Sequence, residues 1–144
     1  MPTSITRVAR SLVTLAAFAG LSAIAHGAEA KSPFIGLWET IDAHDGARTA
    51  CSITPNPDET FSILATSDYF STCEASDGRG KLSATGVLEG DVLVASDTVI
   101  ECANGDVFER LPDEYRYDPE TDLLTQVRVG AERPPLIFHR MSSR

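Results

Sequence analysis

The stretch from Lys81 to Val107, KLSATGVLEGDVLVASDTVIECANGDV, decides the expected fold. Apolar and polar residues alternate in two runs, Lys81–Leu88 and Val92–Cys102, with the period of a strand that buries one face. Turn signals bound both runs. Asn104-Gly105 is the stronger, because both residues tolerate the positive φ of a type I′ hairpin, and Glu89-Gly90 is weaker. The stretch therefore predicts consecutive antiparallel strands.

The same pattern recurs after Ala30, where helical periodicity is hard to find. The predicted strands are Ile35–Asp42, Arg48–Thr54, Thr60–Thr66, Tyr69–Ala75, Lys81–Leu88, Val92–Cys102, Val107–Leu111, Glu114–Tyr117, Leu123–Val129 and Leu136–Met141. Links of two to six residues leave no room for crossover helices. We predict an all-β fold in which an antiparallel up-and-down meander of about 8–10 strands closes into a barrel. A β-sandwich is the alternative, but its Greek-key crossings usually need a long connection.

Alternation also assigns the side chains that face the interior. They are Phe61, Ile63, Leu82, Ala84, Gly86, Val92, Val94, Thr98, Ile100, Cys102, Leu123, Val127 and Val129. Several are small, and a barrel lined by small residues leaves a lumen, whereas large aliphatic residues fill it. The sequence leaves both a cavity and a packed core open.

Residues 1–30 have the organisation of an export signal. Two arginines precede an uncharged stretch from Ser11 to Ala25, and Ala28-Glu29-Ala30 offers the small residues of a cleavage site after position 30. A retained membrane anchor is the alternative, but the stretch is rich in Ala, Gly, Ser and Thr and falls short of about 20 apolar residues. We therefore expect a signal peptide at 1–30, a single β-barrel domain at 31–144 and a periplasmic or secreted product.

The chain is acidic. It has 21 Asp and Glu against 12 Lys and Arg, a net charge of −9, and loss of residues 1–30 changes this to −10. Nucleic-acid affinity rests on clustered Lys and Arg that release counterions, so the balance argues against a nucleic-acid partner and, likewise, against anionic membranes. We expect no cofactor, no membrane span after signal removal, and a monomer.

Three cysteines, Cys51, Cys73 and Cys102, lie in the predicted domain, and an oxidising compartment favours joining two of them. In a meander, Cys51 and Cys73 would face Ser62 from opposite sides, about 9.5 Å apart and too far for a bridge. This register favours Cys73 with Cys102, while the other pairings stay open. Cys51 is then a buried thiol.

The two ends of the predicted domain carry a paired motif. Gly36-Leu37-Trp38 lies on the first predicted strand and Phe138-His139-Arg140 on the last. The pair resembles calycin or lipocalin-like barrels, in which a Gly-x-Trp of the first strand lies under an Arg of the final strand. The resemblance implies that Trp38 and Arg140 meet and plug one end of the barrel, a contact of about 0.5 to 2 kcal/mol.

Nearly the whole domain also resembles small exported bacterial proteins that begin G-x-W-x-x-x-D-x-x-D-G and continue, after two cysteines, with Y-x-Y-D-x-x-T-D-x-L and a terminal Arg. The matching residues are Gly36, Trp38, Asp42, Asp45-Gly46, Cys73, Cys102, Tyr115, Tyr117-Asp118, Thr121-Asp122, Leu124 and Arg140. The resemblance implies the Cys73–Cys102 pairing and the fold, but no activity. Cys51 and His139 depart from the pattern.

Few residues suit catalysis or metal binding. The predicted domain has two histidines, His44 and His139, and lacks the motifs of metalloproteases, α/β-hydrolases, P-loops and dinucleotide folds. A nucleophilic Cys51 beside His44 has no spacing that favours it over chance. A calcium loop at Asp42–Gly46 lacks further spaced oxygens, so a turn capped by Asp side chains explains it better, as at Asp118–Asp122. We expect no enzyme activity and no metal site.

Aromatic side chains give the clearest functional indication. Phe108, Tyr115, Tyr117 and Tyr69 are candidates to line a barrel mouth and bind a ligand, although cross-strand packing also explains them. We predict a non-enzymatic exported barrel that binds a small apolar or amphipathic ligand in the cell envelope. The alternative is a protein-interaction module, an inhibitor or envelope-assembly factor, that acts through its loops. An apolar cavity of about 300 Å³ or more favours the first, and a filled interior favours the second.

Overall fold

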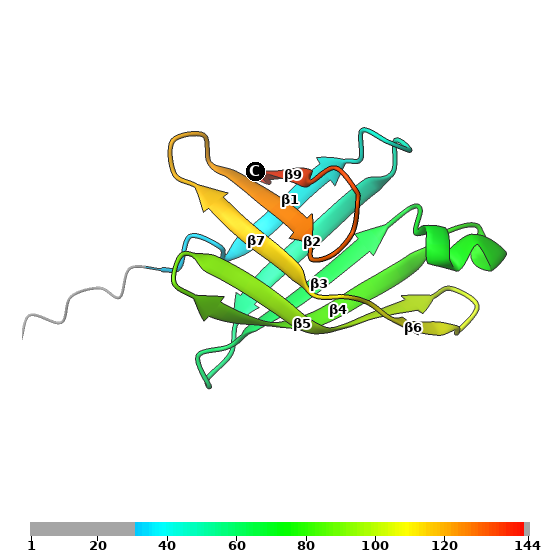
Figure 1. Ribbon diagram of the computed structural model, residues 1–144, viewed down its shortest axis with the longest axis horizontal. Helices are drawn as coiled ribbons and strands as arrows, with labels where there is room; N and C mark the ends of the chain where they lie inside the picture. Colours follow the sequence, from blue (N-terminus) through cyan, green and yellow to red (C-terminus); the bar gives the residue numbers. More distant parts are fainter. Residues whose placement is uncertain (1–30, 143–144) are drawn as a thin grey trace, which may run out of the picture. The chain divides into compact units, whose positions relative to one another are not determined.

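The structure is a computed structural model that describes residues 31–142, so the predicted export signal lies outside the described residues. Nine strands and one short 3₁₀-helix make up this region (Figure 1). They are β1 (Gly36–Ile41), β2 (Arg48–Pro55), β3 (Phe61–Ser67), η1 (Ser71–Ser76), β4 (Gly80–Glu89), β5 (Val92–Cys102), β6 (Val107–Glu109), β7 (Asp113–Asp118), β8 (Leu123–Arg128) and β9 (Leu136–Arg140). Among these residues, no helix has the length and apolar character needed to cross a membrane.

The strands form one antiparallel sheet that closes on itself. Its order is β4-β3-β2-β1-β9-β8-β7-β5, and β4 pairs again with β5 to complete a barrel of eight strands. β7 and β6 lie one after the other along the same edge of β5, so β6 extends the sheet beyond the closed part. The predicted meander barrel is confirmed, because neighbours in sequence are neighbours in the sheet.

The predicted strand at Tyr69–Ala75 is wrong. Ser71–Ser76 form η1, in the connection between β3 and β4. Ser67 at the end of β3 already pairs with Gly80 at the start of β4, so the residues between them lie outside the ladder. Asp77-Gly78, both with positive φ, end the helix and return the chain to the sheet.

A β-bulge in β5 reverses which of its side chains face the interior. Opposite Ser83 to Thr85 of β4, the facing segment of β5 has one residue more, and Asp97 within it has a φ of 50°. The predicted inward pair before the bulge, Val92 and Val94, is therefore wrong. The buried side chains there are Leu93 and Ala95. Beyond the bulge the prediction is confirmed for Thr98, Ile100 and Cys102.

The predicted inward set near β8 is also wrong. Leu123, Val127 and Val129 do not face the interior, whereas Leu124 and Gln126 do. Leu124 pairs with Tyr117 of β7, and Gln126 pairs with Tyr115. Both tyrosines face inward, and this pairing sets the face that β8 buries. Apolar residues occur on both faces of this strand, so alternation alone could not identify the inner one.

The Asn104-Gly105 turn closes the β5–β6 hairpin, but not as the predicted type I′ turn. Gly105 has a φ of 90°, whereas Asn104 does not have a positive φ. The N–H of Gly105 donates to the carbonyl of Cys102 at 2.9 Å. The geometry is that of a type I turn followed by a glycine in the left-handed region.

One end of the barrel is closed around Trp38, which is completely buried. Its Nε1 donates to the Phe34 carbonyl at 2.9 Å, and the Arg140 guanidinium lies 4.0 Å from the centre of the indole. Arg140 also donates to the carbonyls of Pro33 and Ile35. Trp38 and Arg140 are pairing partners on β1 and β9, so the first and last strands meet as predicted.

Gly36 allows this close approach. Its φ is 152°, and a Cβ on it would lie 2.7 Å from Nη1 of Arg140. A larger residue would therefore displace the guanidinium from the indole and strain the backbone of β1.

Replacing Trp38 with Ala is expected to lower the free energy of unfolding by about 3 to 5 kcal/mol, because it removes a large buried side chain. Urea denaturation followed by far-UV circular dichroism measures this. Leu37→Ala is the matched control, since its side chain is 55% exposed on the same strand, and its effect should stay within about 0.5 kcal/mol. A loss under about 1 kcal/mol for Trp38→Ala would contradict a central role for the indole.

Candidate functional site

The interior of the barrel is filled. Sixteen buried apolar residues form one continuous core. At the end opposite Trp38 a cavity of about 70 Å³ remains, far below the roughly 300 Å³ at which small-molecule pockets begin. We call this cavity the barrel mouth. Its polar lining includes Asp42, Arg110, Gln126, Arg128 and Arg133.

A buried carboxyl group lies beside the barrel mouth. Asp113 is 1% exposed, and neither of its oxygens has a hydrogen-bond partner among residues 31–142. Its Oδ1 lies 3.7 Å from Nε of Arg128, a long ion pair. Burial raises the pKa of Asp113 above its ordinary value, and the positive charge of Arg110 and the nearby side chain of Gln126, which lies outside ideal hydrogen-bond geometry, oppose the shift. Burial also lowers the pKa of Arg110.

The turn at Asp42–Gly46 borders the barrel mouth. The carboxylates of Asp42 and Asp45 accept hydrogen bonds from backbone N–H groups two residues later, and the second Asp42 oxygen pairs with Arg133. Asp118 caps its own turn in the same way. These contacts confirm the predicted Asp-capped turns. Within the part of the chain that the structure describes, no group of three His, Cys, Asp or Glu side chains is placed to hold a metal ion.

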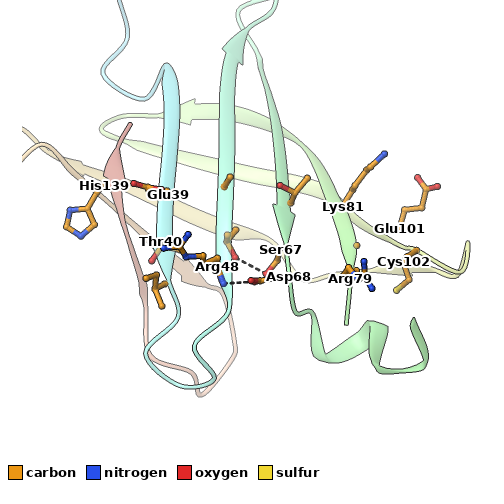
Figure 2. Close-up of a pocket in the computed structure, with 16 residues that line it drawn as sticks. Glu39, Thr40, Arg48, Ser67, Asp68, Arg79, Lys81, Glu101, Cys102 and His139 are labelled. Carbon is orange, nitrogen blue, oxygen red and sulfur yellow. Dashed lines mark hydrogen bonds between the residues drawn. The ribbon is translucent and has the colours of Figure 1, made fainter. Parts of the chain in front are cut away.

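A much larger hollow lies on the outer face of the sheet. Its volume is about 860 Å³, and it extends over β9, β1, β2, β3, β4 and the end of β5 (Figure 2). We call it the outer hollow. The lining residues that face outward are Glu39, Ile41, Arg48, Ala50, Thr66, Asp68, Arg79, Lys81, Glu101, Ala103 and His139.

Six of these residues form one row across the sheet. In strand order they are His139, Glu39, Ala50, Thr66, Lys81 and Glu101, each the pairing partner of the next. The two central members, Ala50 and Thr66, are small. Figure 2 shows the longer side chains of His139 and Glu39 toward one end of the row and those of Lys81 and Glu101 toward the other. Short residues between long ones give the sheet face a floor and two rims.

Apolar side chains continue the outer face. The exposed ones are Leu37, Ile41, Leu64 and Ile137. Ile41 lines the outer hollow and is 60% exposed, while Leu37 and Leu64 flank Ser52 in the neighbouring row. Single exposed apolar residues are ordinary, but several on one sheet face are typical of an interaction surface.

The charges of the outer hollow are balanced, unlike those of the acidic chain. Three basic side chains face three acidic ones: Arg48, Arg79 and Lys81 against Glu39, Asp68 and Glu101. The backbone N–H of Arg48 donates to the carboxylate of Asp68 at 2.6 Å, which fixes that acid at the rim. The outer hollow therefore presents both signs of charge around a small-residue floor.

The structure does not bring the four predicted ligand-binding aromatics into one site. Tyr115 is buried in the core and Tyr69 is exposed in the β3–β4 connection, and both border the barrel mouth. Tyr117 packs edge-on against Trp38 at the closed end. Phe108 lies partly exposed on β6.

Sequence reasoning missed both the barrel mouth and the outer hollow. Arg110 belongs to the predicted strand Val107–Leu111, but β6 ends at Glu109, and Arg133 lies in a connection, so alternation did not bring these two arginines together. The outer hollow had a usable signal. Ala50 and Thr66 occupy outward positions of predicted strands, and small residues there mark a low point on the surface.

Cys73 and Cys102 form a disulfide with their Cα atoms 5.4 Å apart, which confirms the predicted pair. The register behind that prediction is wrong, because Cys51 pairs with Ala65 rather than Ser62 and Cys73 belongs to η1. The bond ties η1 to the last residue of β5. It thereby anchors the longest connection at this end of the barrel.

No protein-family model, curated protein or solved structure matches this chain. The class of protein is therefore defined by its geometry alone. It is a closed antiparallel β-barrel with one sealed end, a filled interior, a small polar mouth and a large outer hollow.

Cys51 is expected to resist alkylation in the folded protein. Burial raises the pKa of its thiol to about 12, so the thiolate that reacts with iodoacetamide is scarce at pH 8. Intact-mass spectrometry should find one added label in urea and none in buffer, with the disulfide kept oxidised. Cys51→Ser should take up no label in either condition. Rapid labelling of the folded protein would contradict the burial of this thiol.

Proposed function

We propose that this protein is a non-enzymatic binding module that receives a segment of a partner protein in the outer hollow. The observation that carries the proposal is the position of the free space, about 860 Å³ outside the sheet against about 70 Å³ inside it. A filled lumen leaves the outer face as the place where a large partner can bind. The proposed interaction surface is thus the face of the sheet rather than the loops.

The lining of the outer hollow supports a polypeptide occupant. A peptide carries charges of both signs, apolar side chains and backbone polar groups, and the outer hollow offers a counterpart to each. Lys81 and Arg48 suit acidic side chains, Glu39 and Glu101 suit basic ones, and Ile41 extends the floor with apolar surface. Such mixed surfaces with a small apolar centre are typical of non-obligate protein interfaces.

A small amphipathic molecule is the second candidate for the same hollow. Its volume falls within the range of about 300 to 1,000 Å³ that small-molecule sites occupy. This version keeps the ligand class expected from the sequence but moves the site from the lumen to the outer face. The ligand's apolar part would rest on Ala50 and Thr66 and its polar groups would meet the rims.

The positions of the reactive residues support binding rather than catalysis. His139 lies on the outer face of β9, and His44 lies in the β1–β2 turn. Cys51 is a buried thiol on β2 with a raised pKa. A nucleophile needs a base within hydrogen-bond reach, and these three residues sit on different parts of the fold.

We also propose that the protein works in the periplasm or outside the cell and is related to the calycin or lipocalin-like exported barrels. The Cys73–Cys102 disulfide supports an oxidising compartment. The indole–guanidinium contact at the barrel's sealed end supports the relationship.

Filling the outer hollow is expected to abolish partner binding. Ala50→Trp places an indole on the floor without entering the core, and should lower recovery of the bound partner by about tenfold or more. Arg116→Trp is the matched control, because it adds the same side chain to an exposed position of β7 outside the outer hollow. The free energy of unfolding of both variants should stay within about 0.5 kcal/mol of the unmodified protein.

The measurement is native mass spectrometry of each tagged protein after cross-linking in its own host. Added polypeptide mass on the unmodified protein and Arg116→Trp, lost in Ala50→Trp, supports the partner-protein proposal. Added small-molecule mass with the same variant pattern supports the second candidate. Equal recovery of the bound species in both variants would remove the outer hollow as the site.

A further inference from the structure

The barrel mouth contains hydrogen-bond donors that the protein does not use. Nη2 of Arg110 and Nε of Arg128 are buried and have no hydrogen-bond acceptor among residues 31–142. Both side chains line the cavity of about 70 Å³. A buried donor without an acceptor costs free energy. An acceptor that enters this cavity therefore binds more favourably than an acceptor that meets a donor on the surface.

The carboxylates nearby leave these donors free. Asp42 is held by Arg133 and by a backbone N–H of its own turn. Asp113 approaches Arg128 only to 3.7 Å, beyond hydrogen-bonding distance. Three arginines, Arg110, Arg128 and Arg133, and three carboxylates, Asp42, Asp45 and Asp113, surround the barrel mouth, so its charges balance in a strongly acidic protein.

The chemistry of guanidinium groups specifies the kind of ligand. Their planar N–H groups match the two oxygens of a carboxylate, and the charge strengthens each hydrogen bond. A multiply charged anion such as sulfate is disfavoured, because Asp42 and Asp113 add negative charge next to the cavity. A cation cannot accept a hydrogen bond from the two unused N–H groups of Arg110 and Arg128. The class that these donors specify is an acceptor of low charge, a singly charged anion.

The size and floor of the cavity narrow this class. A volume of about 70 Å³ accommodates about five water-sized groups, so the ligand has about four to six non-hydrogen atoms. Leu136, Phe138 and Leu82 form an apolar part of the lining. This part suits a short hydrocarbon tail opposite the charged group.

We propose that the barrel mouth is a second binding site, for a small monocarboxylate whose oxygens accept hydrogen bonds from Arg110 and Arg128. The short alkyl tail of the ligand rests on Leu136 and Phe138. Asp113, whose Oδ1 lies 3.7 Å from Nε of Arg128, opposes the ligand's charge, which keeps binding weak and reversible.

The test is a titration of the unmodified protein with acetate, propionate and butyrate at constant ionic strength, with chloride as the reference anion. Isothermal calorimetry and the unfolding temperature should both show saturable binding by the carboxylates. Arg110→Gln should weaken binding by about tenfold or more, the effect of losing a charge-assisted hydrogen bond. Arg116→Gln, the same change on the exterior of β7, should leave the affinity unchanged.

Asp113→Asn should act in the opposite direction and tighten binding severalfold, since it removes the competing negative charge. A purely structural role for these residues would weaken binding in both interior variants. If Arg110→Gln does not fold, ¹H–¹⁵N spectra of the unmodified protein decide the matter. Carboxylate should then shift the signals of Gln126, Arg128 and Leu136 and spare those around Trp38.

The absence of saturable binding over chloride overturns the proposal and assigns the free donors to bound water. Unchanged affinity in Arg110→Gln, or signal shifts confined to the outer hollow, overturns it as well. None of these results bears on partner binding at the outer hollow, which is measured with different variants.

Discussion

The contact between Trp38 and Arg140 turns a linear meander into a closed barrel. Backbone pairing between β1 and β9 covers two residue pairs, whereas β1 and β2 pair along six. One further backbone hydrogen bond, from the N–H of Met141 to the carbonyl of Leu37 at 2.9 Å, and several side-chain contacts complete the seam. The guanidinium stacks on the indole and donates to two carbonyls before β1, and Thr40 donates to the carbonyl of Ile137 at 2.6 Å. This seam joins the first strand of the barrel to the last, so the sheet is continuous around the barrel only where the seam holds.

Closure and a filled core together leave most of the free space outside the lumen. An eight-stranded barrel has an interior just wide enough for its side chains, and here sixteen apolar residues occupy it. The outer hollow and the barrel mouth lie on opposite sides of one sheet layer. Thr49 and Ser67 contribute to the lining of both, and their hydroxyl groups are hydrogen-bonded at 3.0 Å. The barrel thus offers two unlike surfaces, one broad and balanced in charge, the other small and rich in arginine.

The strand pattern was predictable because alternation and turn residues are local signals. Nine of the ten predicted strands are present, and the disulfide pair is as expected. The failures arise where the decisive contact is not local. One extra residue at Asp97 reverses which side chains of β5 face inward, and the pattern of apolar and polar residues does not predict it. Gln126 faces inward because the tyrosines of β7 set its register. The outer hollow depends on six strands, so no single stretch of sequence contains it.

The inward side chains change character along the barrel, from apolar at the sealed end to polar and charged at the barrel mouth. On β8 the inward residues run from Leu124 at the sealed end to Gln126 and then to Arg128 at the barrel mouth. On β7 the corresponding run ends at Asp113. Buried polar groups cost free energy unless they are paired, and apolar residues at these positions would make a more stable core. A fold selected for stability alone would therefore extend its apolar lining to both ends. The barrel is sealed by an indole and a guanidinium where its first and last strands meet, and its inward-facing charged side chains lie at the opposite end.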